Sequence, residues 1–483
     1  MKTMFEISKP GRKAFTLPSK DVNGELIESL PHRFRRGKTL RLPEVSEVDA
    51  VRHWTNLSQR NYHIDKGFYP LGSCTMKYNP KINEETAILS GFTEIHPLQT
   101  ESFVQGALEI MYELGNMMSE ITGLPAVSFQ PVAGAHGEIT GLMLTRTFFE
   151  SKGENREIVL VPDSSHGTNP ASTTLSGFKS VKVSSNERGL VNIDELEEKM
   201  DDGVALLMLT NPNTLGLFES EIKIISEIVH RKGGLIYLDG ANLNALLGIV
   251  KPGETGVDIV HLNLHKTFST PHGGGGPGGG GLCVRDDIAP FLPIPVVKKR
   301  KSGYELDYNL PRSIGKIHSF YGNFNVLVKA YTYLLMLGSN GLRRVSENAI
   351  INANYLKESL REDYELPYKQ HAMHEFVLSG SRQKNLGVKT LDIAKRLLDL
   401  GFHAPTVYFP LIVQEALMIE PTETESKETL DAFISAMKKI ADEVKNEPET
   451  LKNAPVTTPV RRLDEVKAAR ELKVRHTWEK ENE

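Results

Sequence analysis

Lys266 follows directly after an apolar run, which is an unusual position for a charged side chain. The run, residues 257–264, is rich in Val, Ile and Leu and is typical of a buried strand. An amine in a dry pocket is poorly solvated, so its pKa falls and the free base can condense with a carbonyl group. A lysine at a solvated strand end is the alternative, and the neighbouring motifs have to distinguish the two.

A glycine-rich segment, residues 273–281, comes shortly after this lysine. Glycine lets the backbone approach a ligand closely, so the segment could form a close-contact surface or a mobile lid. A phosphate loop in a nucleotide-binding or regulatory module is the alternative from another functional class. That motif requires a following Lys and Ser or Thr at the start of a helix, and this pattern is missing after Gly281.

Other predicted strands also end in polar side chains. Apolar runs predict strands at 158–162, 204–209 and 235–238, and helical stretches lie between them. Such alternation predicts an α/β fold with a mostly parallel sheet covered by helices on both faces. Open sheets of this kind bind ligands beyond the carboxyl ends of their strands. We therefore expect the residues just past these ends to converge on one site: His166, Thr210, Asp239 and Lys266.

Small residues at the start of a predicted helix suggest a place for an anion. Gly134, Ala135 and His136 begin this helix. They leave backbone N–H groups uncovered where the helix dipole is positive, which favours a bound phosphate. The pattern alone is weak, because many helices begin with small residues for capping reasons.

Together these residues supply the groups that pyridoxal phosphate requires. Its phosphate needs N–H donors, its ring a stacking partner, its pyridine nitrogen a carboxylate and its aldehyde a lysine. We assign Lys266 to the aldehyde, Asp239 to the ring nitrogen and His166 to stacking. Singly, Asp239 could cap a helix and His166 could be a buried core histidine. The full predicted cofactor set, in which we expect no metal, is Gly134, Ala135, His136, His166, Thr210, Asp239, Ala241, His265 and Lys266.

Composition excludes several functional classes. The 483 residues carry a net charge of -4 and are 39% hydrophobic, as expected of a globular protein with a large core. This charge gives no electrostatic reason to expect a nucleic acid partner. Only two cysteines occur, so we expect a reducing compartment rather than a disulfide framework. No segment is apolar enough for a membrane span or a secretory signal, which predicts a cytoplasmic enzyme or binding protein.

Changes in sequence character predict four regions. Residues 1–80 are expected to form an extended N-terminal arm with a polar loop that could contact substrate. Residues 81–335 are expected to form the large cofactor-binding domain, and residues 336–447 a smaller α+β domain. The charged residues 448–483 are expected to form a C-terminal tail.

The most distinctive motifs resemble the P-protein family of the glycine cleavage system, and more narrowly the second subunit of its split, two-subunit form. They cover most of the chain between the arm and the small domain, and runs of this length are specific. The matching segments are LGSCTMK (71–77), FQP (129–131), SHGTNPAS (165–172), YLDGAN (237–242), HLNLHKTF (261–268), the glycine run to Gly278, and GFHAPT (401–406).

This resemblance implies a fold-type I pyridoxal-phosphate enzyme that decarboxylates glycine. The carboxylate would leave as CO2, and the aminomethyl group would pass to the lipoyl group of the H-protein. The family also implies a partner, subunit 1, in a heterotetramer with two copies of each chain. Another fold-type I enzyme, either an amino-acid decarboxylase or an aminotransferase, is the alternative activity.

The resemblance also assigns residues around the cofactor. Segment 73–77 resembles the family's substrate-side loop, and segment 272–276 resembles a lid over the cofactor. The candidates are Ser73, Cys74 and Lys77 in the loop, and His272, Gly273 and Gly274 in the lid. Ser269 stands where some family members have a cysteine, which puts thiol control through that loop in doubt. No arginine is identifiable as the partner of the substrate carboxylate.

Overall fold

The chain divides into two compact units in the computed structural model. One unit comprises Ile64–Thr458, and the other comprises Met1–His63 with Pro459–Glu483. The structure describes residues 1–16, 18–19, 21, 30–38, 40–273 and 278–476. All of the predicted site residues except Gly274 lie within the described part of the first unit.

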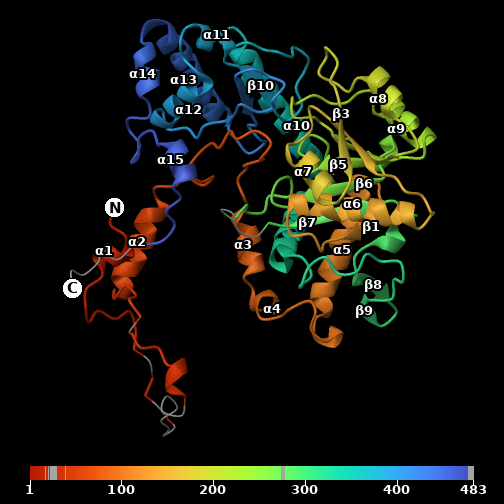
Figure 1. The fold of residues 1–483 in the computed structure, drawn as a ribbon, viewed down its shortest axis with the longest axis horizontal. Helices are drawn as coiled ribbons and strands as arrows, with labels where there is room; N and C mark the ends of the chain where they lie inside the picture. Colours follow the sequence, from red (N-terminus) through yellow and green to blue (C-terminus); the bar gives the residue numbers. More distant parts are fainter. Residues whose placement is uncertain (17, 20, 22–29, 39, 274–277, 477–483) are drawn as a thin grey trace. The chain divides into compact units, whose positions relative to one another are not determined.

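A seven-stranded sheet forms the centre of the larger unit (Figure 1), in the order β1-β7-β6-β5-β4-β2-β3. The neighbouring strands β6, β5, β4, β2 and β3 pair in parallel. Strand β7 pairs antiparallel with both β6 and β1. The predicted mostly parallel sheet is therefore confirmed. The strands are β1 (Ala126–Ser128), β2 (Ile158–Pro162), β3 (Lys179–Val183), β4 (Val204–Thr210), β5 (Leu235–Gly240), β6 (Ile259–Asn263) and β7 (Gly280–Val284).

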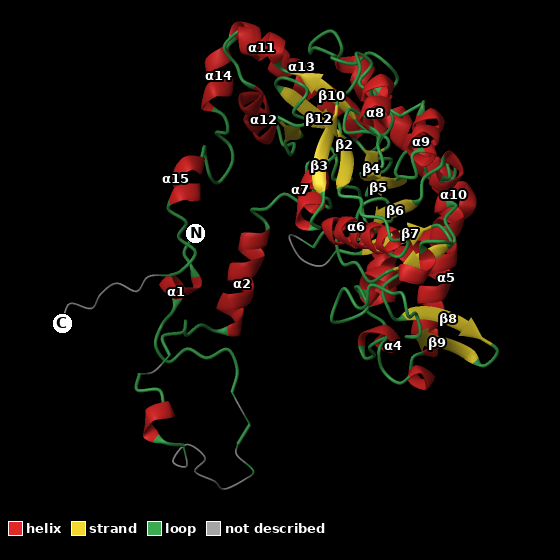
Figure 2. Ribbon diagram, turned by 45° about the vertical axis from the view of Figure 1, so that its right-hand side comes forward, coloured by secondary structure: helices red, strands yellow, loops and turns green. Residues whose placement is uncertain are grey.

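Helices cover both faces of this sheet (Figure 2), because its central strands are apolar on both sides. In β5, Ile236 and Leu238 belong to one hydrophobic core, whereas Leu235 and Tyr237 belong to another. The first core includes side chains of α5, α9 and α10, and the second includes side chains of α6. These helices are α5 (Gln105–Thr122), α6 (Gly134–Glu150), α9 (Ile222–Arg231) and α10 (Phe324–Leu360), and shorter ones are α3 (Lys81–Ala87), α4 (Ser90–Thr93), α7 (Thr168–Leu175) and α8 (Ile193–Lys199).

The C-terminal part of this unit is a smaller α+β layer. Its antiparallel sheet has the strand order β10-β12-β11. Helix α10 leads into it and has a non-helical residue, Gly338, in its interior. Its strands and helices are β10 (Phe376–Ser379), β11 (Thr406–Val407), β12 (Ala416–Ile419), α11 (Ser381–Asn385), α12 (Thr390–Asp399), α13 (Lys427–Asn446) and α14 (Pro448–Asn453). A hairpin of β8 (Val296–Arg300) and β9 (Gly303–Asp307) stands apart from both sheets.

The other unit contains three α-helices in its described residues: α1 (Met4–Ile7), α2 (Glu47–Ser58) and α15 (Glu465–Arg470). Helix α2 is capped by Ser46, whose side chain accepts a hydrogen bond from the Asp49 N–H. Val48, Val51 and Trp54 on this helix are more than half exposed. Within the described residues, no helix is both long and apolar enough to cross a bilayer.

Candidate active site

Lys266 lies in the turn that follows β6, and its amine reaches a distant loop. Its backbone N–H donates to the Asn263 carbonyl at 3.1 Å. Its Nζ donates to the Ser73 carbonyl at 2.8 Å. The side chain is half-buried. The fold therefore joins the predicted catalytic amine to the predicted substrate-side loop.

Asp239 lies at the end of β5 and is only 4% exposed. Asn169 Nδ2 donates to its Oδ2 at 2.8 Å, and the Ala241 N–H donates to Oδ1 at 3.1 Å. His261 Nε2 lies 3.3 Å from Oδ1. Burial alone would raise the pKa of Asp239, but His261, His166, the Asn169 hydrogen bond and Lys266 outweigh it and lower the pKa. The site thus contains a buried anion at neutral pH.

His166 follows β2 and presents a half-buried ring next to this anion. Its Nδ1 lies 2.8 Å from Thr168 Oγ1, which donates to Glu138 Oε1 at 2.6 Å. Burial lowers the pKa of His166 despite the nearby charge of Asp239. The ring is therefore mostly neutral at pH 7, and a flat neutral imidazole can stack on an aromatic cofactor.

Asn169 forms hydrogen bonds with both Asp239 and Thr210, the residue at the end of β4. Thr210, at the end of β4, donates through Oγ1 to Asn169 Oδ1 at 3.4 Å, and it pairs with Asp239 in the sheet register. His166, Thr210, Asp239 and Lys266 thus come together at the carboxyl edge of the parallel strands. Their roles toward a cofactor stay predictions.

The start of α6 has the features of an anion site. Its N-cap, Ala133, makes no side-chain capping hydrogen bond, and no acidic residue lies in the first turn. Ala135 is exposed, and His136 Nδ1 accepts from the Val132 N–H at 3.3 Å. A Cβ on Gly134 would lie 2.7 Å from Nδ2 of Asn263, so only glycine permits this close approach. Asn263 Oδ1 is itself buried without a hydrogen-bond partner among the described residues.

Two further histidines adjoin Lys266. The His265 and His272 ring centroids are 5.0 Å apart, and His272 Nε2 donates to the Cys74 carbonyl at 2.9 Å. Burial, together with His272 and Lys266, lowers the pKa of His265 to about 3. Burial and Lys266 lower the pKa of His272 to about 4. Both rings are therefore neutral at physiological pH. Gly273 adopts a φ of 73°, whereas Gly274 and residues 275–277 lie outside the described residues.

The substrate-side loop contains one buried ion pair and one half-buried thiol. Lys77 Nζ donates to Glu423 Oε1 at 2.7 Å and to Asn244 Oδ1 and Tyr333 OH at 3.1 Å. The Lys77 side chain is 1% exposed, so its amine is engaged by the fold. Burial raises the pKa of the Cys74 thiol to about 11, which keeps it protonated at neutral pH.

Replacing Lys77 by methionine is expected to destabilise the chain by about 3–5 kcal/mol, because the buried Glu423 carboxylate would lose its cation. Urea unfolding of the cofactor-free protein measures this difference. The double variant Lys77→Met with Glu423→Gln removes both charges and should recover a large part of the loss. A single variant within about 1 kcal/mol of wild type would show that the pair is not a stabilising contact.

Several residues that complete the site were not among the predicted ones. His261, in the middle of β6, is fully buried, and its Nδ1 lies 2.7 Å from Tyr237 OH. A histidine inside an apolar strand is the sequence signal that could have indicated it. Glu138 and Asn169 also belong to this group, but they lie within helices, where a polar residue is unremarkable.

The donor set at the strand ends fits pyridoxal phosphate. It offers an amine at Lys266, a buried carboxylate at Asp239, a neutral ring at His166 and an uncapped helix start at Gly134. Ligand atoms of Glu138, Asp239 and His261 also lie within 4.8 Å of one another, which is a spacing that a metal ion could use. A second such group contains His374, Glu375 and Glu420.

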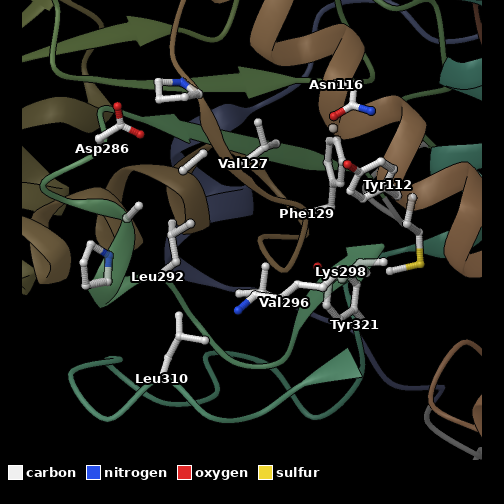
Figure 3. Close-up of a pocket in the computed structure, with 17 residues that line it drawn as sticks. Tyr112, Asn116, Val127, Phe129, Asp286, Leu292, Val296, Lys298, Leu310 and Tyr321 are labelled. Carbon is white, nitrogen blue, oxygen red and sulfur yellow. The ribbon is translucent and has the colours of Figure 1, made fainter. Parts of the chain in front are cut away.

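Two cavities lie near the sheet. A cavity of about 770 Å³ borders the start of α6 through Val132 and Ala133 and reaches Gly278. The cavity in Figure 3, of about 420 Å³, lies beside α5, β1 and β8. Its labelled residues include Tyr112, Phe129 and Lys298. None of the predicted site residues line this second cavity.

Comparisons with known proteins identify the family. The sequence model of the family described as "Glycine cleavage system P-protein" matches residues 15–301, and that of "Glycine dehydrogenase, C-terminal domain" matches residues 345–458. A probable glycine dehydrogenase (decarboxylating) subunit 2 from Chloroherpeton thalassium is 58% identical over 98% of this chain and 97% of its own length. The protein of the same name from Alkaliphilus oremlandii is 59% identical over 99% of both chains.

Solved structures show the same fold. A crystal structure of glycine decarboxylase (P-protein) of the glycine cleavage system, in inhibitor-bound form, has a TM-score of 0.71 at 22% identity and covers 86% of this chain and 94% of its own. Lactobacillus brevis glutamate decarboxylase has a TM-score of 0.67 at 14% identity, covering 85% of this chain and 96% of its own. The predicted fold-type I architecture is confirmed. The chain belongs to the glycine cleavage system P-protein family.

Proposed function

We propose that this chain is the cofactor-binding subunit of a glycine dehydrogenase (decarboxylating). It binds pyridoxal phosphate, removes CO2 from glycine within the glycine cleavage system, and transfers the remaining aminomethyl group to the lipoyl group of the H-protein. The convergence of the Lys266 amine and the buried Asp239 carboxylate at one edge of the sheet is the observation that carries this proposal. Membership of the P-protein family gives the reaction.

Each group of the site has a role in holding the cofactor. Lys266 Nζ would bind the aldehyde carbon, and the N–H groups at the start of α6 would bind the phosphate. The carboxylate of Asp239 would keep a proton on the pyridine nitrogen, while His166 would stack on the ring. When bound, pyridoxal phosphate supplies an electron sink for the electron pair that CO2 leaves behind.

The surroundings of Lys266 suit a reaction that must proceed away from water. His265 and His272 stay neutral at physiological pH and bring no competing charge to the amine. The loop at Ser73 and Cys74 lies against Lys266 and His272. We assign this loop to the substrate side, and we assign His272 and Gly273 to the predicted lid over the cofactor.

We propose that the chain works with a second, related subunit. The relatives from Chloroherpeton thalassium and Alkaliphilus oremlandii are named subunit 2, which supports a partner subunit 1. We propose that the two chains form a heterotetramer with two copies of each. The exposed apolar residues of α2 support contact with another chain. The lipoyl arm of the H-protein would reach Lys266 from outside the chain. A cytoplasmic location for this protein stays a prediction.

An exchange assay tests the proposal. The chain alone should bind pyridoxal phosphate but incorporate labelled bicarbonate into glycine slowly, and adding subunit 1 and lipoylated H-protein should restore exchange. Full activity of the isolated chain would contradict the need for partners. If the complete mixture exchanges no label yet releases CO2 from another amino acid, the chain is a different decarboxylase of this fold.

A further inference from the structure

The loop that meets Lys266 has an unusual backbone. Ser73 and Thr75 adopt φ values of 63° and 51°, in the left-handed region that side-chain-bearing residues rarely occupy. Such a conformation persists only where the surrounding structure holds it. We call residues 71–77 the 71–77 loop.

Two buried glutamates hold these two strained residues. Glu375 Oε2 accepts from the Ser73 N–H at 2.6 Å, and Glu420 Oε2 accepts from the Thr75 N–H at 2.8 Å. Glu420 Oε1 also accepts from Thr75 Oγ1 and from Asn242 Nδ2, each at 2.8 Å. Glu375 is 3% exposed and Glu420 is fully buried. Each strained residue therefore donates its N–H to one buried carboxyl group.

The opposite side of the 71–77 loop faces the candidate active site. The Ser73 carbonyl accepts from Lys266 Nζ at 2.8 Å, and the Cys74 carbonyl accepts from His272 Nε2 at 2.9 Å. The Thr75 N–H and the Cys74 carbonyl belong to one planar peptide group, so the bond to Glu420 fixes the direction of the carbonyl that accepts from His272. The Ser73 carbonyl belongs to the peptide group between Ser73 and Cys74. Glu375 holds the peptide group before this one through the Ser73 N–H, and Glu420 holds the one after it, so its orientation is restricted from both sides.

Joining the loop to the small sheet does not by itself require these carboxyl groups. Leu71 bridges to Ile419, and the Gly72 N–H donates to the Met418 carbonyl at 3.3 Å, so the backbone of β12 already holds the start of the loop. Burying two carboxyl groups together is costly. Burial and the nearby Glu420 raise the pKa of Glu375 well above its usual range, which reflects this cost. Anchoring the loop therefore does not explain why Glu375 and Glu420 are buried together. Their hydrogen bonds to Ser73 and Thr75 indicate a functional role instead.

We infer that Glu375 and Glu420 are positioning residues for Lys266: they orient the 71–77 loop so that the Ser73 carbonyl holds the Lys266 amine where the aldehyde of pyridoxal phosphate arrives. This inference rests on the proposed function, because it assigns Lys266 to that cofactor. Neither glutamate needs to touch the cofactor or the substrate. They act through the backbone of the loop, from the small α+β layer that follows the large sheet.

The rate at which Lys266 captures the cofactor tests this role. Cofactor-free protein is mixed with pyridoxal phosphate, and the appearance of the visible absorbance band and of a borohydride-stable adduct on Lys266 is followed. Glu420→Gln keeps the volume but leaves only one acceptor oxygen for the Thr75 and Asn242 donors, so capture should slow by about tenfold or more. The pH midpoint of the absorbance band, which reports the protonation of the Lys266 linkage, should shift as well.

Glu375 gives a second, graded pair of variants. Glu375→Gln keeps an acceptor for the Ser73 N–H, whereas Glu375→Leu removes it at similar volume. Capture should therefore be slower in the Leu variant than in the Gln variant. Glu425→Gln is the matched control, because Glu425 makes no hydrogen bond or ion pair with the 71–77 loop among the described contacts, and it should capture the cofactor at the wild-type rate.

Circular dichroism and thermal unfolding establish that each variant is folded. If Glu420→Gln does not fold, Thr75→Ala replaces it, since it removes one donor to Glu420 while the Thr75 N–H and Asn242 Nδ2 still donate to this carboxyl group, and capture should still slow by about threefold. Wild-type capture rate and pH midpoint in the folded variants would overturn the inference and leave the proposed function intact. If the wild-type chain forms no Lys266 adduct, the proposed function fails, and the inference fails with it.

Discussion

Borohydride reduction of the chain loaded with pyridoxal phosphate is expected to attach the cofactor to Lys266, and the variant Lys266→Arg is expected to retain no reducible adduct. Arginine keeps the positive charge but cannot form the linkage, because its guanidinium stays protonated. The exchange rate should then fall by about three orders of magnitude or more, equivalent to about 4 kcal/mol of barrier. Peptide mapping by mass spectrometry identifies the labelled lysine.

Two features of the structure make this expectation specific. Within the described residues, Lys266 is the lysine whose amine meets the 71–77 loop beside the strand ends, and the amine of Lys77 is engaged by Glu423. Lys81→Arg serves as the control, because Lys81 is half exposed and pairs with Asp65. An adduct on any lysine other than Lys266 would contradict the assignment of the site.

Asp239→Asn is expected to lower the exchange rate by several orders of magnitude while the chain stays folded. The amide keeps the shape and can still accept from the Ala241 N–H, but it cannot hold a proton on the pyridine nitrogen as an anion does. A loss of about 1.4 kcal/mol of transition-state stabilisation lowers the rate tenfold. A variant within about tenfold of wild type would mean that the carboxylate is structural.

The same substitution also predicts a change in pH dependence. The pKa of Asp239 is lowered in the folded chain, so its ionised form stabilises the fold at neutral pH. This stabilisation is fully present above the pKa that Asp239 has in the unfolded chain, which is about 4. It is lost as the pH falls through the lower pKa that Asp239 has in the folded chain. Asp239→Asn should remove that part of the acid sensitivity, as measured by urea unfolding between neutral and acidic pH. An unchanged acid profile would show that other groups dominate it.

The parts of the site that depend on local patterns could be predicted from the sequence. Asp239 and Lys266 stand out because an apolar run ends just before each of them, and the start of α6 stands out because its residues are small. These signals need only a few neighbouring residues. The parallel order of strands at one edge then brings the side chains together.

Features that depend on distant partners could not be predicted. Lys77 looked like a substrate contact, but its partner Glu423 lies 346 residues along the chain. Thr390 is of a residue type that often caps helices, but Lys389 occupies the cap of α12 and the Thr390 hydroxyl donates to the Glu415 carbonyl. In both cases a tertiary contact decides the role of a polar side chain. Gly401 follows the C-cap of the same helix with a φ of 86°, which fits the local rule that glycine ends helices in the left-handed region.

The contacts of the 71–77 loop also determine when the chain can complete its site during synthesis. The loop leaves the ribosome 302 residues before Glu375 and 345 residues before Glu420. At about 5–20 residues per second, this delay is about 15–70 s. When Lys266 has just left the ribosome, the nascent chain therefore carries the amine but still lacks the two carboxyl groups that orient the loop beside it. From the inferred role of these glutamates, we expect stable attachment of the cofactor only in the finished polypeptide, and a chain cut short before Glu420 should keep its lysine but position it poorly.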